Sequence, residues 1–508
     1  MRLQLALTAA LTSQVAFGGT DTWFTPLTES APVVAPNALE ELTSPWVTPA
    51  GISQNNAVSL REVEDSILSP EQSIVRVNAG RSSSMFDMIA YDPSGEYIFI
   101  PHETPFGAGC SRYSIYENKN EVIFQGDSSG AEGDWDGDYG AFDPSRFTPN
   151  GTVILGEEWT GTGRLVEILN PFAPVEEIEH RVLESIANVA HEGINFSKQF
   201  DDTLYYVDEW NSGSIYKFVM STPGDYTHGQ TFVLSVDAFV PTGGVAADLW
   251  NEQAPGVVRE GAATWVPLTD KNGVPLPGIT DPFRDGPTND PRTASDTRGG
   301  RPAADDAMAT PFGRPEDMAV GRLKNGNEVV FFCATSESKV YSIEILAFNK
   351  GKGKGKGHAS KEQKVIVRTF ASADMPKNVG FEPTTGSLNS PDNLAIDALG
   401  NIYVIEDAPN GSSTGGDIWF VRDLNNDGVG ESLDHFMSIR VSQSEATGMI
   451  WNPAVPTEFA VCVQHPQSTD LSAVPNGLGD AVWLFNVSHI DNQEFVEKLN
   501  KSDATFGE

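Results

Sequence analysis

Short apolar segments recur along the chain in pairs, with a turn between the two members of each pair. In the first pair, residues 86–91 and 97–100 are mostly apolar and flank the turn Asp92-Pro93-Ser94-Gly95. A polar or acidic residue precedes each pair, and polar residues follow it. The unit occurs over 86–100, 143–155, 191–207, 314–332, 391–405 and 445–463. Short β-branched and aromatic segments around such turns predict antiparallel hairpins rather than helices.

Six copies of a hairpin unit predict an all-β fold, a six-bladed β-propeller with long loop insertions. The copies are farther apart than the roughly 40–50 residues of one blade, so extra segments must lie between them. One insertion spans about 222–312 and is rich in Gly, Pro, Asp and Thr, which predicts a loop excursion over one face. The other, 350–363, begins with alternating Lys and Gly and predicts a flexible hairpin tip.

The first residues have the features of a secretory signal peptide. Arg2 precedes the mostly apolar segment 3–17, which is too short to cross a membrane comfortably, and 16–18 offer small residues for cleavage before Gly19. We therefore expect a signal peptide at 1–18 and a secreted protein, extracellular or periplasmic. An N-terminal arm with an outer strand would span 19–80, and the propeller 81–508.

Composition excludes several classes of protein. The 508 residues include 33 Lys and Arg against 70 Asp and Glu, a net charge of −37, which repels nucleic-acid phosphates. Cys110, Cys333 and Cys462 form no CxxC pair, which excludes a disulfide framework and a zinc finger. No segment after the first is long and apolar enough to span a membrane. We expect a monomer that binds a small molecule, with no nucleic acid and no membrane span.

Acidic residues recur at matching positions of the repeat. Those that precede or begin the first apolar segment are Asp143, Glu192, Glu316, Asp392 and Glu445, and those that follow the second are Glu103, Glu157, Glu158 and Asp407, with His465 in the last copy. In a propeller these positions converge at one mouth of the channel, where uncompensated carboxylates would repel one another strongly. Bound cations relieve that repulsion. Such residues could instead cap turns or pair with arginines, but their recurrence favours a metal cluster.

Arg314 lies two residues before Glu316. A guanidinium beside metal-binding carboxylates can grip a phosphate or carboxylate of a substrate with two hydrogen bonds. A structural ion pair with Glu316 or Asp317 explains the spacing equally well, so the sequence leaves both roles open.

A separate calcium signal occurs at residues 423–434. Its candidate ligands, by their spacing, are Asp423, Asn425, Asp427, Glu431 and Asp434, with Gly428 at the sixth position of a twelve-residue calcium loop. The twelfth residue is Asp instead of Glu, and no helices flank the loop. We expect a calcium-stabilised loop between strands, with an acidic turn that binds no metal as the alternative.

Several of these segments together resemble the PhoX-type alkaline phosphatases, exported metal-dependent phosphomonoesterases. The similar segments, in the family's order, are 101–103 (Pro-His-Glu), 148–152 (Thr-Pro-Asn-Gly-Thr) before Glu157-Glu158, 191–193 (His-Glu-Gly), 261–265 (Gly-Ala-Ala-Thr-Trp), 314–316 (Arg-Pro-Glu), 391–393 (Pro-Asp-Asn) and 464–466 (Gln-His-Pro). Each is short, but seven in order on one repeat pattern are fairly specific, and they cover most of the chain from about 84 to 467.

The resemblance implies a six-bladed propeller with an iron and calcium cluster at the channel mouth. It implies metal ligation by Glu192, Glu316 and one of Asp392 or Asp407, with Glu103 and Glu157 or Glu158 as further ligands. Arg314 would hold the substrate phosphate. The family has an iron-binding cysteine where this chain has Asp143. A carboxylate favours harder cations than a thiolate does, so the chain could use calcium alone, use iron differently or have lost the activity.

Three hypotheses follow from the sequence. The first is an exported phosphatase that hydrolyses phosphate monoesters, with calcium and possibly iron as cofactors. The second is a calcium-dependent lactonase of the gluconolactonase type, whose propellers also carry Asp-Asn segments such as 392–393, although 314–316 has no evident role there. The third is a non-catalytic binding propeller that calcium only stabilises.

Overall fold

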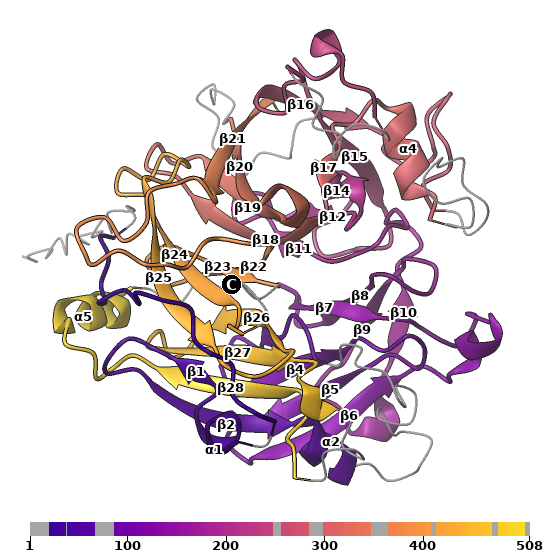
Figure 1. The fold of residues 1–508 in the computed structure, drawn as a ribbon. Coiled ribbons are helices and arrows are strands. Elements are labelled where there is room, and N and C mark those ends of the chain that lie inside the picture. Colours follow the sequence, from indigo (N-terminus) through magenta and orange to yellow (C-terminus); the bar gives the residue numbers. More distant parts are fainter. Residues whose placement is uncertain are drawn as a thin grey trace, which may run out of the picture.

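The computed structural model describes residues 20–36, 38–66, 86–246, 256–283, 298–346, 364–407, 413–469 and 476–502. The expected signal peptide at 1–18 and the insertion at 350–363 lie outside the described residues. The protein is mainly β, and its antiparallel sheets stand around a central axis in a β-propeller arrangement (Figure 1). No helix among the described residues combines the length and apolar character needed to cross a membrane.

Four-stranded meanders form most of the sheets, and each runs from the axis outward. The first contains β3 (Ala90–Tyr91), β4 (Tyr97–His102), β5 (Gly109–Ser114) and β6 (Lys119–Gln125), and the second contains β7 (Phe142–Phe147), β8 (Val153–Glu157), β9 (Leu165–Ile168) and β10 (His180–Val182). Another contains β22 (Pro391–Ile396), β23 (Ile402–Glu406), β24 (Asp417–Arg422) and β25 (Ser432–Ile439), with β1 (Trp46–Val47) added at its outer edge.

A nine-stranded sheet occupies one side of the molecule. Its strands, in spatial order, are β11 (Ile194–Phe196), β12 (Thr203–Val207), β14 (Ile215–Met220), β15 (Gly229–Val236), β16 (Gly261–Pro267), β21 (Lys364–Ser372), β20 (Lys339–Ile345), β19 (Glu328–Ala334) and β18 (Pro315–Arg322). β13 (Asn211–Gly213) pairs with β17 (Phe312–Gly313). Both ends of the large sheet, β11 and β18, lie near the axis (Figure 1).

The region 222–312 differs from the expected loop excursion. It contains β15 and β16, and β16 joins the strands before it to those after it. The helix α4 (Gly300–Asp306) also lies in this region. The abundant Gly, Pro and Asp residues concealed two apolar segments, 231–236 and 262–267, whose alternation would have predicted strands.

The N-terminal arm completes a sheet made from the end of the chain. β2 (Ser53–Ser59) pairs antiparallel with β28 (Ala481–Asn486), beyond β27 (Glu458–Gln464) and β26 (Glu445–Trp451). Nearer the start of the arm, the ring of Trp23 stacks on Phe495 with 4.4 Å between ring centroids. The pairing closes the ring of sheets with backbone hydrogen bonds between residues more than 400 positions apart.

Helices are few and peripheral. Within the described part of the chain, the α-helices are α1 (Leu39–Thr43), α2 (Leu60–Ser66), α4 and α5 (Gln493–Lys501), and the 3-10 turns are η2 (Ser129–Glu132), η3 (Val175–Glu177), η4 (Val240–Thr242), η5 (Thr335–Glu337) and η6 (Gln467–Thr469). The core lies between neighbouring sheets. One apolar cluster joins Val58 of β2 to Ile98 and Ile100 of β4, with Cys462 of β27 and Val482 of β28.

Because β2 closes the ring, its buried side chains should contribute strongly to stability. Val58 is 1% exposed and opposite Val482. We expect Val58→Ala to lower the free energy of unfolding by roughly 1–3 kcal/mol, measured by denaturant titration. Asn55→Ala, at an exposed position of the same strand, is the control and should change it by less than about 0.5 kcal/mol. Equal effects at the two positions would contradict a closing role for β2.

Candidate metal centre

One acidic residue marks the beginning of each strand that lines the axis. These residues are Asp87, just before β3, Asp143 in β7, Glu192, just before β11, Glu316 in β18, Asp392 in β22 and Glu445, the first residue of β26. Because the inner strands run in the same direction along the axis, their beginnings meet at one end of the channel. All six side chains line one cavity of about 250 Å³.

The second strands of four of the six hairpins add residues to the same cavity. Glu103 follows β4, Glu158 follows β8, Asp407 follows β23, and Gln464 and His465 lie at the end of β27. In an antiparallel hairpin the end of the second strand lies beside the beginning of the first. The hairpin repeat therefore places two sets of polar side chains at one mouth.

β-Bulges occur where three of these carboxylates lie. The register of β7 and β8 shifts between Phe142 and Ser145, that of β18 and β19 between Pro315 and Met318, and that of β22 and β23 between Pro391 and Asn393. The shifts span Asp143, Glu316 and Asp392. A bulge bends a strand and changes the direction of its side chain, which explains how a strand that lines the channel can direct a carboxylate to its mouth.

The carboxylate oxygens are close enough to share cations. Three overlapping groups have ligand atoms within 4.8 Å of one another: Asp87 with Glu103 and Asp143, Asp143 with Glu158 and Glu192, and Glu192 with Glu316 and Asp392. Asp143 belongs to two groups and Glu192 to two, so the groups form a chain across the mouth. Residues more than 300 positions apart in sequence thus form one constellation.

Burial makes these groups hard to ionise without a cation. It raises the pKa of Asp87 to about 6, and that of Glu316 to about 7 against the opposing charge of Arg314. Burial, reinforced by neighbouring carboxylates, also raises the pKa values of Asp143, Glu158 and Glu192 well above their usual range. Burial and the charge of Glu316 do the same to Asp392. The common cause is a set of like charges in a site with little water.

The donors present fit a cation. Oε2 of Glu316 and Oδ1 of Asp143 are buried and accept no hydrogen bond from the described residues. Buried polar atoms without partners are costly, so a ligand that accepts their lone pairs is the simplest explanation. The cysteines are buried, and none of the groups that could hold a metal among the described residues includes one. An all-oxygen set of this kind suits hard cations such as calcium.

Neighbouring side chains orient part of the cluster. Gln464 Nε2 donates to Asp87 Oδ2 at 2.5 Å and to Glu103 Oε2 at 2.8 Å, and Trp159 Nε1 donates to Glu103 Oε1 at 2.5 Å. Thr447 Oγ1 donates to the other oxygen of Asp87. These bonds hold two carboxylates in place while leaving oxygen lone pairs for a cation.

Arg314 contacts three carboxylates at the edge of the same cavity. Its Nε donates to Glu209 Oε1 at 2.5 Å, Nη2 is 3.2 Å from Glu316 Oε1, and Nη1 is 3.8 Å from Asp407 Oδ2. The carboxylate of Glu316 raises the pKa of Arg314, which keeps the guanidinium charged. Its side chain is still 36% exposed, so it is at once ion-paired and open to the cavity. The two roles that the sequence left open are therefore compatible.

His465 also lines the cavity. Its Nε2 is 2.9 Å from Glu445 Oε1. Burial disfavours the imidazolium, but the charge and hydrogen bond of Glu445 together with the charges of Asp480 and Glu103 outweigh it and raise the pKa of His465 to about 9. Both Arg314 and His465 have positive φ, at 51° and 27°. Strained backbone of this kind is found disproportionately at functional sites.

The structure separates Glu158 from Glu157. Glu157 is fully buried, and its carboxylate accepts bonds from Arg164 Nε at 3.0 Å and from the backbone N–H of Arg164 at 2.9 Å. It does not line the metal cavity. Successive residues of a strand point to opposite sides, so only one of the pair can face the mouth. Glu157 is therefore a structural ion-pair partner, which corrects its inclusion among the ligands.

The loop at 423–434 lies between β24 and β25, and its acidic residues have protein partners. Asp423 Oδ2 accepts the Gly428 N–H at 3.0 Å, Asp427 Oδ1 accepts that of Val429 at 3.0 Å, and Glu431 Oε2 accepts that of Leu424 at 2.8 Å. Burial raises the pKa of Asp423 to about 6. Asn425 is exposed. These bonds are those of a tight Asx-type turn, and calcium binding by the loop stays a prediction.

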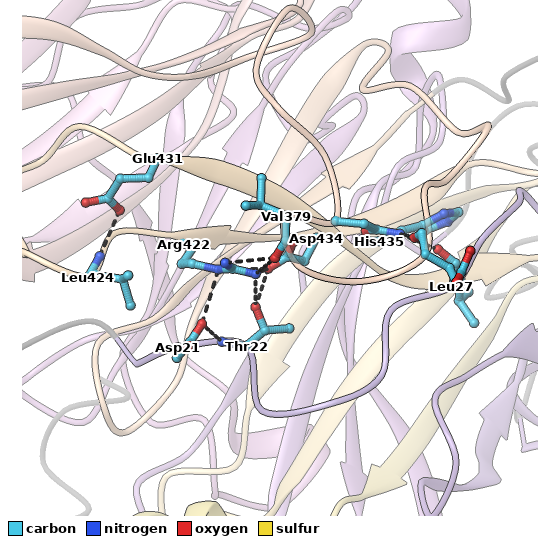
Figure 2. A network of polar contacts seen from close by, with 11 residues as sticks. Asp21, Thr22, Leu27, Val379, Arg422, Leu424, Glu431, Asp434 and His435 are labelled. Carbon is cyan, nitrogen blue, oxygen red and sulfur yellow. Dashed lines mark hydrogen bonds and ion pairs between the residues drawn. The ribbon is translucent and has the colours of Figure 1, made fainter.

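Asp434 is turned away from that loop. It lies in β25, where its Oδ2 accepts from Arg422 Nη2 at 2.7 Å and from Thr22 Oγ1 (Figure 2). Asp21 lies on the other side of the same guanidinium, at 3.4 Å (Figure 2). The expectation that Asp434 closes a calcium loop is corrected: it anchors the N-terminal arm through Arg422.

Sequence reasoning missed Asp87, Trp159 and Glu209. Asp87 occupies the repeat position of the other inner-strand carboxylates, so comparing the first copy with the rest would have found it. Trp159 follows Glu158, and its indole bond to Glu103 depends on a fold contact that no local pattern encodes. Glu209 follows the second strand of the third copy, at the repeat position of Glu103 and Glu158, so the same comparison would have found it.

Comparison with known proteins identifies one family. A model of the family described as alkaline phosphatase PhoX matches residues 116–467, well over half of the chain. Pseudomonas fluorescens PhoX in complex with vanadate has a TM-score of 0.58 at 14% identity, covering 93% of this chain and 100% of that one. The match to a Xanthomonas campestris gluconolactonase covers 93% of this chain and 98% of that one, at 9% identity and a TM-score of 0.40. No curated protein matches the sequence. At 14% identity the likeness to Pseudomonas fluorescens PhoX shows the fold alone.

The raised pKa values predict how the metal-free protein responds to pH. A carboxyl whose pKa is raised by folding contributes stability that is fully present below its unfolded value, near 4, and is lost as pH rises through its folded value. For Asp87 and Glu316 that window ends at about 6 and about 7. We expect the melting temperature of metal-free protein to fall by roughly 5–10 °C from pH 5 to pH 8, measured by calorimetry.

Calcium should remove most of this fall, because it compensates the ionised carboxylates. Glu316→Gln should flatten the profile of the metal-free protein, whereas Glu494→Gln, on the surface of α5, should not. Identical pH profiles with and without calcium would show that the cluster does not bind it.

Proposed function

The chain belongs to the PhoX alkaline phosphatase family, a family of phosphoric monoester hydrolases, and on that premise we propose that it is an exported, calcium-dependent phosphomonoesterase. Its metal cluster would occupy the carboxylate cavity at one mouth of a six-bladed propeller. The single observation that carries this proposal is the convergence of six inner-strand carboxylates with Arg314 on one cavity.

The proposed count of six blades is supported by dividing the nine-stranded sheet into two. The runs β11-β12-β14-β15 and β18-β19-β20-β21 each have the order of a four-stranded blade, and β16 bridges their outer edges. With the four other large sheets this gives six blades, which agrees with the six hairpin copies. Export is supported by residues 1–18 of the sequence.

The charge of the cavity explains why a cation is needed for a phosphate substrate. Nine carboxylates line it, against the side chains of Arg314 and His465. Without cations such a site repels a phosphate monoester. When bound, calcium would neutralise the carboxylates, attract the substrate oxygens and stabilise negative charge in the transition state. Glu103, Asp143, Glu158, Glu192, Glu316 and Asp392, with Asp87, are the residues that would hold it.

Arg314 would orient the substrate. Glu209 fixes one edge of the guanidinium, and the exposed part of the side chain leaves N–H groups for phosphate oxygens. Its backbone is held on both sides, because its N–H donates to Trp210 O at 3.1 Å and its carbonyl accepts from the Thr335 N–H at 3.1 Å. A charge held this firmly needs little reorganisation when charge develops on the phosphate.

The direct test measures phosphate release from p-nitrophenyl phosphate by the purified protein. We expect turnover with calcium, loss of activity on chelation and recovery when calcium returns. Arg314→Lys should lower kcat/KM roughly a hundredfold, because a lysine cannot form the paired hydrogen bonds. Arg181→Lys is the matched control: Arg181 is also ion-paired and half-exposed, at 2.7 Å from Glu167, but lies on the outer strand β10.

Two outcomes would contradict the proposal. One is activity that survives chelation. The other is the absence of turnover on phosphate monoesters when calcium and iron are both supplied to folded protein.

Asp143 should decide which metal the activity requires. We propose that calcium alone restores the metal-free protein, because the cluster supplies carboxylate oxygens and no thiolate. In Asp143→Cys, a soft ligand replaces a hard one shared by two groups of the cluster. Calcium alone should then restore at least tenfold less activity than calcium with iron.

Asp407→Cys is the control, since Asp407 lines the cavity but lies outside the three groups of close carboxylates. It should retain restoration by calcium alone. A wild-type protein that needs iron would overturn the assignment of calcium as the sufficient cation.

A further inference from the structure

A second cavity lies at the other end of the inner strands. Its volume is about 720 Å³, nearly three times that of the metal cavity. Each inner strand contributes to both: β18 directs Glu316 to the metal cavity, while Met318 and the residues after it line the second cavity. β22 does the same with Asp392 and Leu394. No described residue lines both cavities.

The two cavities are separated by buried polar contacts along the axis. Asp317 Oδ1 accepts from Arg146 Nη2 at 2.9 Å, and its Oδ2 accepts the Leu394 N–H at 3.1 Å. Asn393 Oδ1 accepts the Gly448 N–H at 2.5 Å. These contacts join different inner strands across the channel, so the second cavity is a site in its own right.

The walls of the second cavity are largely apolar. Phe147, Met318, Leu394, Ile396 and Trp451 line it. Its volume falls in the range of roughly 300–1,000 Å³ that is typical of small-molecule sites. Apolar walls that stay open, instead of collapsing into the core, form a surface that an apolar ligand would cover favourably.

Cationic groups stand at this apolar surface. Arg146 Nε donates a hydrogen bond to the carbonyl of Ile194 at 2.7 Å, and Nη2 donates one to Asp317. Its Nη1 has no partner in the described part of the chain. Arg322, at the end of β18, is exposed, and among the described residues its backbone carbonyl accepts a hydrogen bond from Asn426 Nδ2 at 3.1 Å. Lys198 also lines the cavity. The acidic residue in the lining, Glu328, is already bonded to Ser197 and Tyr205.

This concentration of positive charge is unusual for a chain with a net charge of −37. We propose that the second cavity binds a small amphipathic organic anion, with its anionic head at Arg322 and Arg146 and its apolar body against the Phe147, Met318 and Trp451 walls. Charge complementarity selects the anionic head, and the apolar area selects the body. The proposal is independent of the phosphatase activity, because it concerns the opposite mouth.

Octanoate is a suitable probe, with octan-1-ol, octyltrimethylammonium and acetate as comparisons that remove the charge, reverse it or remove the apolar body. Binding to the calcium-loaded full chain is measured by calorimetry and by the change in tryptophan fluorescence. We expect octanoate to bind at least tenfold more tightly than any of the three. Equal binding of octyltrimethylammonium, or of acetate, would overturn the proposal.

Two variants test whether octanoate binds in the second cavity. Arg322→Glu should weaken octanoate binding at least tenfold, whereas Lys324→Glu makes the same charge change two residues away, at an exposed position outside the cavity, and should leave it within twofold. Ala398→Trp, at a half-buried turn position in the cavity wall, should block the apolar body. Phosphate release checks that each variant is folded. Unchanged octanoate binding in folded Arg322→Glu or Ala398→Trp protein would contradict the proposed site.

Discussion

Repulsion between buried carboxylates is the constraint on which the rest of this structure depends. At the 4.8 Å limit that groups their oxygens, each ionised pair costs about 3 kcal/mol even at an effective dielectric constant of about 20. A few such pairs equal the roughly 5–15 kcal/mol that stabilises a typical domain. The mouth can therefore be fully charged and stable only with cations bound, or uncharged and metal-free at low pH. The proposed metal binding and chemistry would therefore be coupled to stability through the same seven side chains.

The propeller arrangement makes this concentration of charge possible. Inner strands that run in the same direction deliver one acidic side chain each, and the second strands deliver a further set to the same end. Stability comes from elsewhere, from apolar clusters between sheets and from the closure of β2 on β28. Because the inner strands continue past the mouth, the same elements build a second, apolar cavity behind the Arg146–Asp317 contact. One axis thus carries two sites of opposite chemical character.

The chain belongs to the PhoX family, and Asp143 stands where the resemblance drawn from the sequence implies an iron-binding cysteine. Asp143 lies in the middle of the carboxylate chain and is shared by two groups. In the proposed function, an oxygen ligand there would make the cluster uniformly hard, while Arg314, held between Glu209 and Glu316, would offer its charge to the phosphate. The ion pair and the proposed substrate contact would then be two roles of one side chain.

The sequence alone determined the β class, the hairpin repeat and the acidic positions, because turns and alternation are local properties of the chain. It even marked Asp87 and Glu209 by repeat position, although that signal was overlooked. It did not distinguish Glu157 from Glu158, show that Asp434 is bound by Arg422, or reveal the strands within 222–312. Strand pairing and side-chain direction in those regions depend on partners distant in sequence. Only the tertiary structure decided which carboxylates share a cavity, since electrostatic coupling depends on separation in space and not along the chain.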